Sequence, residues 1–167
     1  AEQYAMHVKG LEMPGYEPRG AKWTGLNYIT CACGACHCMG RLISKEFQTV
    51  DRLAEAGYAD VTKLYQDHVA AVETGVLCLF GEFLWARSPT IFHKLLASVT
   101  GIPQFADEEF LLLVGERIWN LERAFNIREG FGRKDDVYPK RFATEPLKKA
   151  WPSEGAIIKN PEGMLDE

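Results

Sequence analysis

The sequence lacks several features that define whole classes of protein. None of its apolar runs approaches the roughly 20 residues that a membrane-spanning helix needs. No positively charged start is followed by an apolar segment, as a secretion signal would require. Lys and Arg form no patch, and the formal net charge of -4 offers no basic surface for nucleic acid. We therefore expect neither a membrane nor a nucleic acid as a partner.

Cysteine is scarce outside one short segment. Four of the five cysteines lie between Cys31 and Cys38, and the fifth is Cys78. An odd count with this clustering is unlike a disulfide framework, and it favours metal or redox chemistry in a reducing compartment. We therefore predict a cytoplasmic protein.

Strand patterns are also missing, because no segment alternates polar and apolar residues over any length. The first 25 residues contain Pro14, Pro18 and several glycines, which predicts an ordered loop. The last forty residues are rich in Gly, Pro and charge, which predicts irregular structure. Helices are predicted over 41–56, 60–72 and 91–100, and from Asp107 onward. The predicted fold class is all-α, with one irregular helical domain over residues 1–167.

Two of these helices have detailed predictions. One takes Asp60 as its N-cap. Its predicted buried stripe is Val61, Leu64, Tyr65, His68, Val69 and Val72. The other starts at Asp107, with Glu108 and Glu109 in the first turn, where the helix dipole favours acids. Its predicted buried stripe is Phe110, Val114, Ile118, Leu121 and Phe125.

The cysteine-rich segment is TCACGACHC, which ends at Cys38. Thiolates hold zinc or an iron–sulfur cluster only when four ligands converge, and these spacings disfavour convergence on one centre. Free cysteine is also among the most buried residue types, so packing is an alternative role. Gly34 and Ala35 indicate a close approach to the backbone, and His37 is either a proton donor or a core histidine. A stand-alone zinc-binding module is one hypothesis, with Cys31, Cys33, Cys36 and Cys38 as its ligands.

Longer motifs point elsewhere. The run WNLERAFNIREGFGRKDDVYPKR, from Trp119 to Arg141, resembles a signature of the tungsten-containing aldehyde ferredoxin oxidoreductase family. The preceding GERI at 115–118 and LASVTGI at 96–102 extend the resemblance. VKGLEMPGYEPRGAK is similar to the family's VKGLE–P–YDPRG–K segment, and LNYITCACGACH is similar to its LAYATSNRGACH. The resemblance covers most of residues 5–150 and implies the third, helical domain of a much longer chain, so we expect a piece of a larger protein.

The resemblance assigns chemistry to two short segments. It implies that His37 lies near the tungsten and donates a proton or hydrogen bond to an oxygen ligand of the metal, a task that suits imidazole. The segment ETGVLC, which starts at Glu73 and ends at Cys78, resembles the family's DxxGLC motif. There the acid hydrogen-bonds the pterin, and the cysteine is the fourth ligand of a [4Fe–4S] cluster. The resemblance thus implies a catalytic His37, a metal ligand in Cys78, and a cofactor-binding set of Cys36, Met39, Glu73, Leu77 and Cys78.

The sequence departs from the family at three places. Glu73 replaces an aspartate, and Val76 replaces a glycine where the family backbone comes close to the cofactor. The family's SNRG becomes CACG, which removes a cation and an amide and predicts a less polar pocket. Since the family uses no cysteine ligand at Cys31, Cys33 or Cys38, we interpret these three as packing or supporting groups.

The function implied by the resemblance is part of a tungstopterin oxidoreductase that converts an aldehyde and water to a carboxylic acid. Its cofactors would be tungstopterin, with molybdenum as the alternative metal, and a [4Fe–4S] cluster that passes electrons to ferredoxin or a similar carrier. An alternative is another low-potential reaction on the same scaffold, such as tungsten-dependent aromatic acyl-CoA reduction. The remaining domains of the parent chain are the other expected partner, and a homo-oligomer stays open. The 167 residues alone are expected to be inactive, because the family's other three cluster cysteines are missing.

Overall fold

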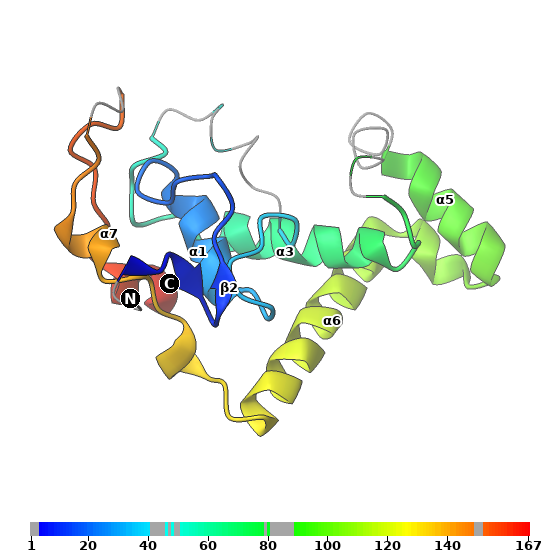
Figure 1. The fold of residues 1–167 in the computed structure, drawn as a ribbon. Helices are drawn as coiled ribbons and strands as arrows, with labels where there is room; N and C mark the ends of the chain where they lie inside the picture. The colour runs from blue at the N-terminus through cyan, green and yellow to red at the C-terminus, as the bar shows by residue number, and fades with distance from the viewer. Residues whose placement is uncertain are drawn as a thin grey trace.

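The computed structural model describes residues 4–40, 46, 48, 51–78, 80, 89–148 and 152–167, and helices dominate them (Figure 1). Two short strands, β1 (His7–Val8) and β2 (Leu11–Glu12), pair antiparallel. The longer helices are α1 (Lys22–Thr30), α3 (Ala59–Glu73), α5 (Pro89–Thr100) and α6 (Glu108–Arg128). The shorter ones are η3 (Pro103–Ala106), η4 (Arg133–Asp135), α7 (Arg141–Thr144) and α8 (Pro161–Asp166). The all-α prediction is confirmed.

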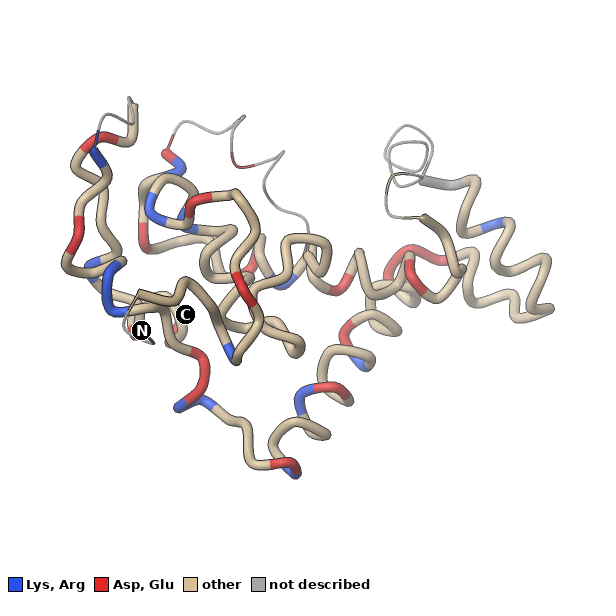
Figure 2. Tube along the Cα trace, in the orientation of Figure 1, with Lys and Arg blue, Asp and Glu red and all other residues tan. Residues whose placement is uncertain are grey.

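The described elements form a bundle at one end and an extended arm at the other. In Figure 1, the hairpin, α1, α7 and both termini gather at one end, and α3 runs from there toward α5. Helix α6 returns obliquely from the α5 end across α3. Figure 2 shows acidic and basic residues interspersed along the described chain, in agreement with the absence of a basic patch. None of the described helices is long and apolar enough to cross a bilayer.

Two apolar clusters hold this arrangement. The first joins distant segments at the terminal end: Val8, Leu26, Tyr28, Ile29, Ala35, Phe142, Ile158 and Met164. The second lies where α3 meets α5 and α6: Ala71, Val72, Phe92 and Leu111. Because Ala35 belongs to the first cluster, the cysteine-rich loop is anchored to the core.

Helix α1 starts at Lys22, inside the segment predicted to be a loop, so that prediction is wrong for its last residues. Its N-cap, Ala21, provides no side-chain acceptor. The buried carboxylate of Glu46 replaces the missing cap. It accepts hydrogen bonds from the backbone N–H groups of Trp23 and Thr24 at 2.8 and 3.0 Å, and from the Thr24 hydroxyl at 2.8 Å. A cap that comes from so far along the chain leaves no local signal in the sequence.

Helix α3 begins at Ala59, so Asp60 lies in its first turn and is not the N-cap. The predicted apolar stripe is also partly wrong, because Leu64 is exposed while Gln66 and Asp67 are buried. The buried polar groups have partners. The Gln66 side chain donates to Asn27 at 2.9 Å and to Thr30 at 2.8 Å, which ties α3 to α1.

Helix α6 starts as predicted, since the Asp107 side chain caps it by accepting from the backbone N–H of Phe110 at 2.9 Å. The predicted buried stripe is partly wrong, since only Phe110, Val114 and Ile118 are half-buried. Leu121 and Phe125 are 72% and 60% exposed, whereas Leu111 and Gly115 are buried. Helix α6 packs closely against α3 at Gly115, so the face with Leu111 and Gly115 turns inward and the C-terminal part of the predicted stripe faces outward.

The other helix predictions have mixed outcomes. The helix at 91–100 is confirmed as α5, with two more residues at its start. For the helix at 41–56, residues 51–56 instead form turns and bends, and most of 41–50 lies outside the described residues. The last forty residues are mainly irregular, as predicted, apart from η4, α7 and α8.

Candidate functional site

The cysteine-rich loop, residues 31–40, follows α1 directly. Helix α1 ends where Cys31 turns to an extended conformation. Gly34 then adopts a positive φ of 102°, and a Cβ there would overlap the backbone carbonyl of Val8. The close approach predicted at Gly34 is therefore real, and its partner is strand β1 of the same chain.

Side chains from three elements fix the backbone of this loop. From α6, the Asn126 amide donates to the carbonyl of Ala32 at 2.8 Å. From α1, the Asn27 amide donates to the carbonyl of Cys36 at 3.2 Å. Lys9, beside the hairpin, donates to the carbonyl of Cys31 at 3.2 Å and to that of Ile29. The loop is held in place by helix, hairpin and core together.

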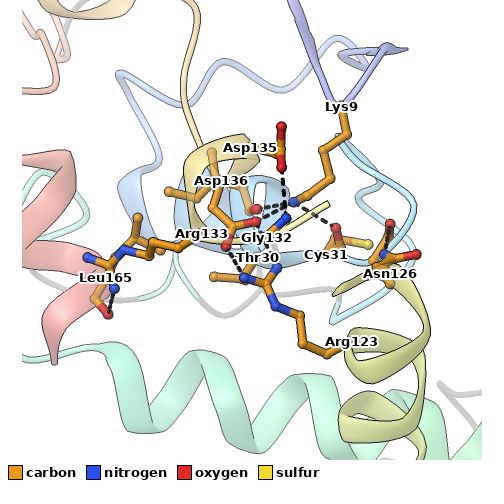
Figure 3. A network of polar contacts seen from close by, with 12 residues as sticks. Lys9, Thr30, Cys31, Arg123, Asn126, Gly132, Arg133, Asp135, Asp136 and Leu165 are labelled. Carbon is orange, nitrogen blue, oxygen red and sulfur yellow. Dashed lines mark hydrogen bonds and ion pairs between the residues drawn. The ribbon is translucent and has the colours of Figure 1, made fainter. Parts of the chain in front are cut away.

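Lys9 is also part of an ionic network, shown in Figure 3. Its Nζ lies 2.7 Å from Oδ1 of Asp136, and Arg123 binds both oxygens of the same carboxylate at 2.9 and 2.5 Å. Burial by itself raises the pKa of Asp136, but the hydrogen bonds from Arg123 and Lys9 outweigh it and hold the pKa below its ordinary value. The three residues come from the VKGLE, NLER and DD motifs, so the segments that carry the family resemblance meet here. None of these three residues was predicted to be functional from the sequence, although all three lie in the motifs.

Two cysteines of the loop are in contact. Cys31 Sγ lies 3.4 Å from Cys33 Sγ, with Cys31 buried and Cys33 exposed. The hydrogen bond from the Cys31 thiol is the main cause that lowers the pKa of Cys33 to about 6, with a further contribution from the Cys36 thiol. The same contact, together with burial, raises the pKa of Cys31. The contact therefore favours the thiolate form of Cys33 over that of Cys31.

His37 is half-buried, so the structure does not place it in the core. Its ring centroid lies 5.0 Å from that of Tyr16, and its Nε2 lies 3.7 Å from Sγ of Cys38. Met39 and Cys36 are half-buried on the same loop. The histidine is thus oriented by its neighbours while part of its ring still faces solvent.

The ETGVLC segment forms the end of α3 and the turn after it. Glu73 is the last residue of the helix, and the backbone N–H of Val76 donates to its carbonyl at 2.9 Å. Val76 has a positive φ of 53° and is 92% exposed. This conformation favours glycine, which is the residue that the family has at this place in its motif. Leu77 and Cys78 are also exposed.

The two predicted parts of the site lie along one helix. The loop contacts α3 near Gln66, where a Cβ on Gly40 would press against the Gln66 side chain. Glu73 lies about two helical turns further along. Partial desolvation of its carboxyl group, and then the charge of Glu122 on α6, raise the pKa of Glu73. Glu122 also acts weakly on Cys33, so both parts lie within electrostatic range of the same α6 carboxylate.

Within the described part of the chain, no three His, Cys, Asp or Glu side chains are placed to hold a metal ion together. All four loop cysteines are described, so the stand-alone zinc hypothesis gains no support from the structure. Cys78, like Cys33, has an exposed thiol that is not in a disulfide. It fits one ligand of a cluster whose other ligands come from elsewhere. Glu73, also exposed, fits a group that binds a donor outside this chain.

The sequence matches the family described as "Aldehyde ferredoxin oxidoreductase, domains 2 & 3" over residues 1–167. The chain belongs to this family. Among curated relatives, the tungsten-containing aldehyde ferredoxin oxidoreductase of Pyrococcus furiosus is 36% identical over 166 residues, and that of Thermococcus kodakarensis is 35% identical over 166 residues. Each alignment covers 96% of this chain and 27% of the relative, so the chain spans about a quarter of their length. Membership confirms the resemblance seen in the motifs.

Proposed function

We propose that this chain is the helical part of a tungstopterin oxidoreductase that oxidises aldehydes to carboxylic acids. Its family membership supports the proposal, as do relatives that are named tungsten-containing aldehyde ferredoxin oxidoreductases. The observation in the structure that carries it is the turn after α3. Val76 adopts there the left-handed conformation that the glycine of the DxxGLC motif would take, and Cys78 follows it, exposed.

In this proposal, each predicted residue has one role. Cys78 provides a thiolate to a [4Fe–4S] cluster, and Glu73 accepts hydrogen bonds from the pterin. Cys36, Met39 and Leu77 contact the cofactors. When bound, the tungstopterin and the cluster supply the oxygen-transfer and electron-transfer chemistry. His37 donates a proton or hydrogen bond from its half-buried ring, whose orientation Tyr16 and Cys38 restrict.

The proposed partners follow from the same role. The remaining domains of the parent chain would supply the other cluster ligands, and ferredoxin or a similar carrier would accept the electrons in the cytoplasm. The isolated 167 residues would then show no aldehyde oxidation with a dye acceptor. Turnover of an aromatic acyl-CoA but of no aldehyde by the full-length protein would favour the alternative reaction.

The test compares cysteine variants of the full-length protein. Cys78→Ser should lose iron and change or abolish the electron paramagnetic resonance signal of the reduced cluster. Cys33→Ser is the matched control, because it replaces another exposed thiol, and it should keep both the iron and the signal. Full iron in Cys78→Ser, together with iron loss in Cys33→Ser, would overturn the assignment.

A second comparison isolates His37. In the full-length protein, His37→Ala should lower aldehyde turnover by about 10²–10⁴-fold, the usual contribution of a general acid or base. Tungsten and iron contents should stay at the parent level, since a proton donor is not a ligand. Loss of tungsten from this variant would instead assign the histidine a ligating or structural role.

A further inference from the structure

We propose that Cys31 and Cys33 form a reversible dithiol–disulfide couple, which makes the cysteine-rich loop a site of redox modification. The proposal is independent of the function proposed above. It concerns two cysteines at positions where the family resemblance gives cysteine no role.

The first support is the distance between the sulfurs. At 3.4 Å, the two Sγ atoms are already in contact, and a disulfide would bring them to about 2.05 Å. The backbone on either side is fixed by the Lys9 and Asn126 hydrogen bonds to the carbonyls of Cys31 and Ala32. The two thiols therefore stay near each other, which favours closure over reaction with a second molecule.

The second support is the difference between the two thiols. Cys33 is exposed within these 167 residues, whereas Cys31 is buried. The hydrogen bond from Cys31 favours the thiolate of Cys33, the form that acts as a nucleophile. The arrangement thus has an attacking thiol at the surface and a resolving thiol in contact with it.

The oxidant is a low-molecular-weight disulfide, RSSR. The Cys33 thiolate attacks one sulfur of RSSR, forming a mixed disulfide and releasing one RS⁻. Cys31 then loses its proton and attacks Cys33 Sγ, which releases the second RS⁻ and forms the Cys31–Cys33 bond. Two thiols are oxidised by two electrons in total, and RSSR is reduced to two thiols.

The test uses the full-length protein equilibrated with glutathione and glutathione disulfide over a range of ratios. After acid quenching and alkylation, trypsin should release residues 23–41, a peptide that contains all four loop cysteines. At oxidising ratios we expect label on Cys36 and Cys38 only, a bond between Cys31 and Cys33 located by fragmentation, and recovery of all four labels after reduction.

Two variants complete the design. Cys33→Ser, at an exposed position, should abolish the bond without loss of the fold, which circular dichroism checks. Cys38→Ser removes another loop thiol and should keep the bond. Four labelled cysteines at the most oxidising ratio, a mixed disulfide that Cys31 never resolves, or a bond that involves Cys36 or Cys38 would each overturn the proposal.

Discussion

Lys9 and Asp136 form an ion pair with both side chains only 4% exposed, at an Nζ–Oδ1 distance of 2.7 Å. The pair joins the turn of the N-terminal hairpin, between β1 and β2, to the segment after α6. Lys9 also donates to the carbonyl of Cys31. The ion pair therefore connects the packing of two family motifs, VKGLE and DD, to the position of the cysteine-rich loop.

Asp136→Asn should lower the free energy of unfolding by about 3–5 kcal/mol, because it leaves the buried Lys9 ammonium without a counter-charge. Urea denaturation of parent and variant measures the difference. Glu162→Gln is the control. The Glu162 side chain is 70% exposed, and the substitution removes its ion pair with Arg133. It should cost at most about 1 kcal/mol. If both variants lost the same free energy of unfolding, the prediction that the buried ion pair stabilises more than the exposed one would be wrong.

The same carboxylate predicts a pH dependence. The folded-state pKa of Asp136 lies below its ordinary value, so the unfolded chain binds its proton first. Its contribution is fully present above the ordinary pKa of about 3.9 and is lost as the pH falls through the lower folded-state value. The stability difference between parent and Asp136→Asn should therefore shrink below about pH 4. Denaturation at a series of pH values checks this, and a difference that grows toward acid would contradict it.

Gly115→Ala should destabilise the protein although alanine is the better helix former. A Cβ at this position would overlap the backbone carbonyl of Asp67, so α6 and α3 would have to move apart. We expect a lower melting temperature. Gly132→Ala is the control, because nothing lies within 4 Å of a Cβ there and its φ of -147° suits any residue. If Gly115→Ala left the melting temperature unchanged, α6 and α3 would not be in contact at this point.

Val76→Gly should stabilise the protein by about 1 kcal/mol, because it relieves a left-handed conformation that costs a β-branched residue about 1–2 kcal/mol. Val76 is 92% exposed, so little packing is lost. Val99→Gly provides the opposite case, since Val99 is 84% exposed within helix α5. Glycine there should destabilise by a similar amount. Calorimetry of both variants gives the sign of each change in stability. A lower stability of Val76→Gly would show that this turn is not strained.

The sequence by itself determined the features that depend on near neighbours. The start of α6 follows from Asp107 and the acids after it, because a cap and a helix dipole act within one turn. The end of α5 at Thr100 follows from Gly101, whose positive φ of 71° suits a glycine just after a helix. The run from Trp119 to Arg141 indicated the family, and the ETGVLC motif marked the position of Val76, where the structure shows the conformation that glycine prefers.

Tertiary structure decided what depends on distant segments. Apolar spacing on α6 favoured a buried Leu121 and Phe125, but Gly115 lets α3 approach most closely, so the adjacent face with Leu111 and Gly115 is buried. Helix α1 could start at Lys22 only because Glu46 caps it from beyond the loop. The spacing of the cysteines likewise could not show that Cys31 and Cys33 touch, since Lys9 and Asn126 hold the loop from other parts of the chain. Periodicity records which residues share a face, whereas burial depends on which distant element packs against that face.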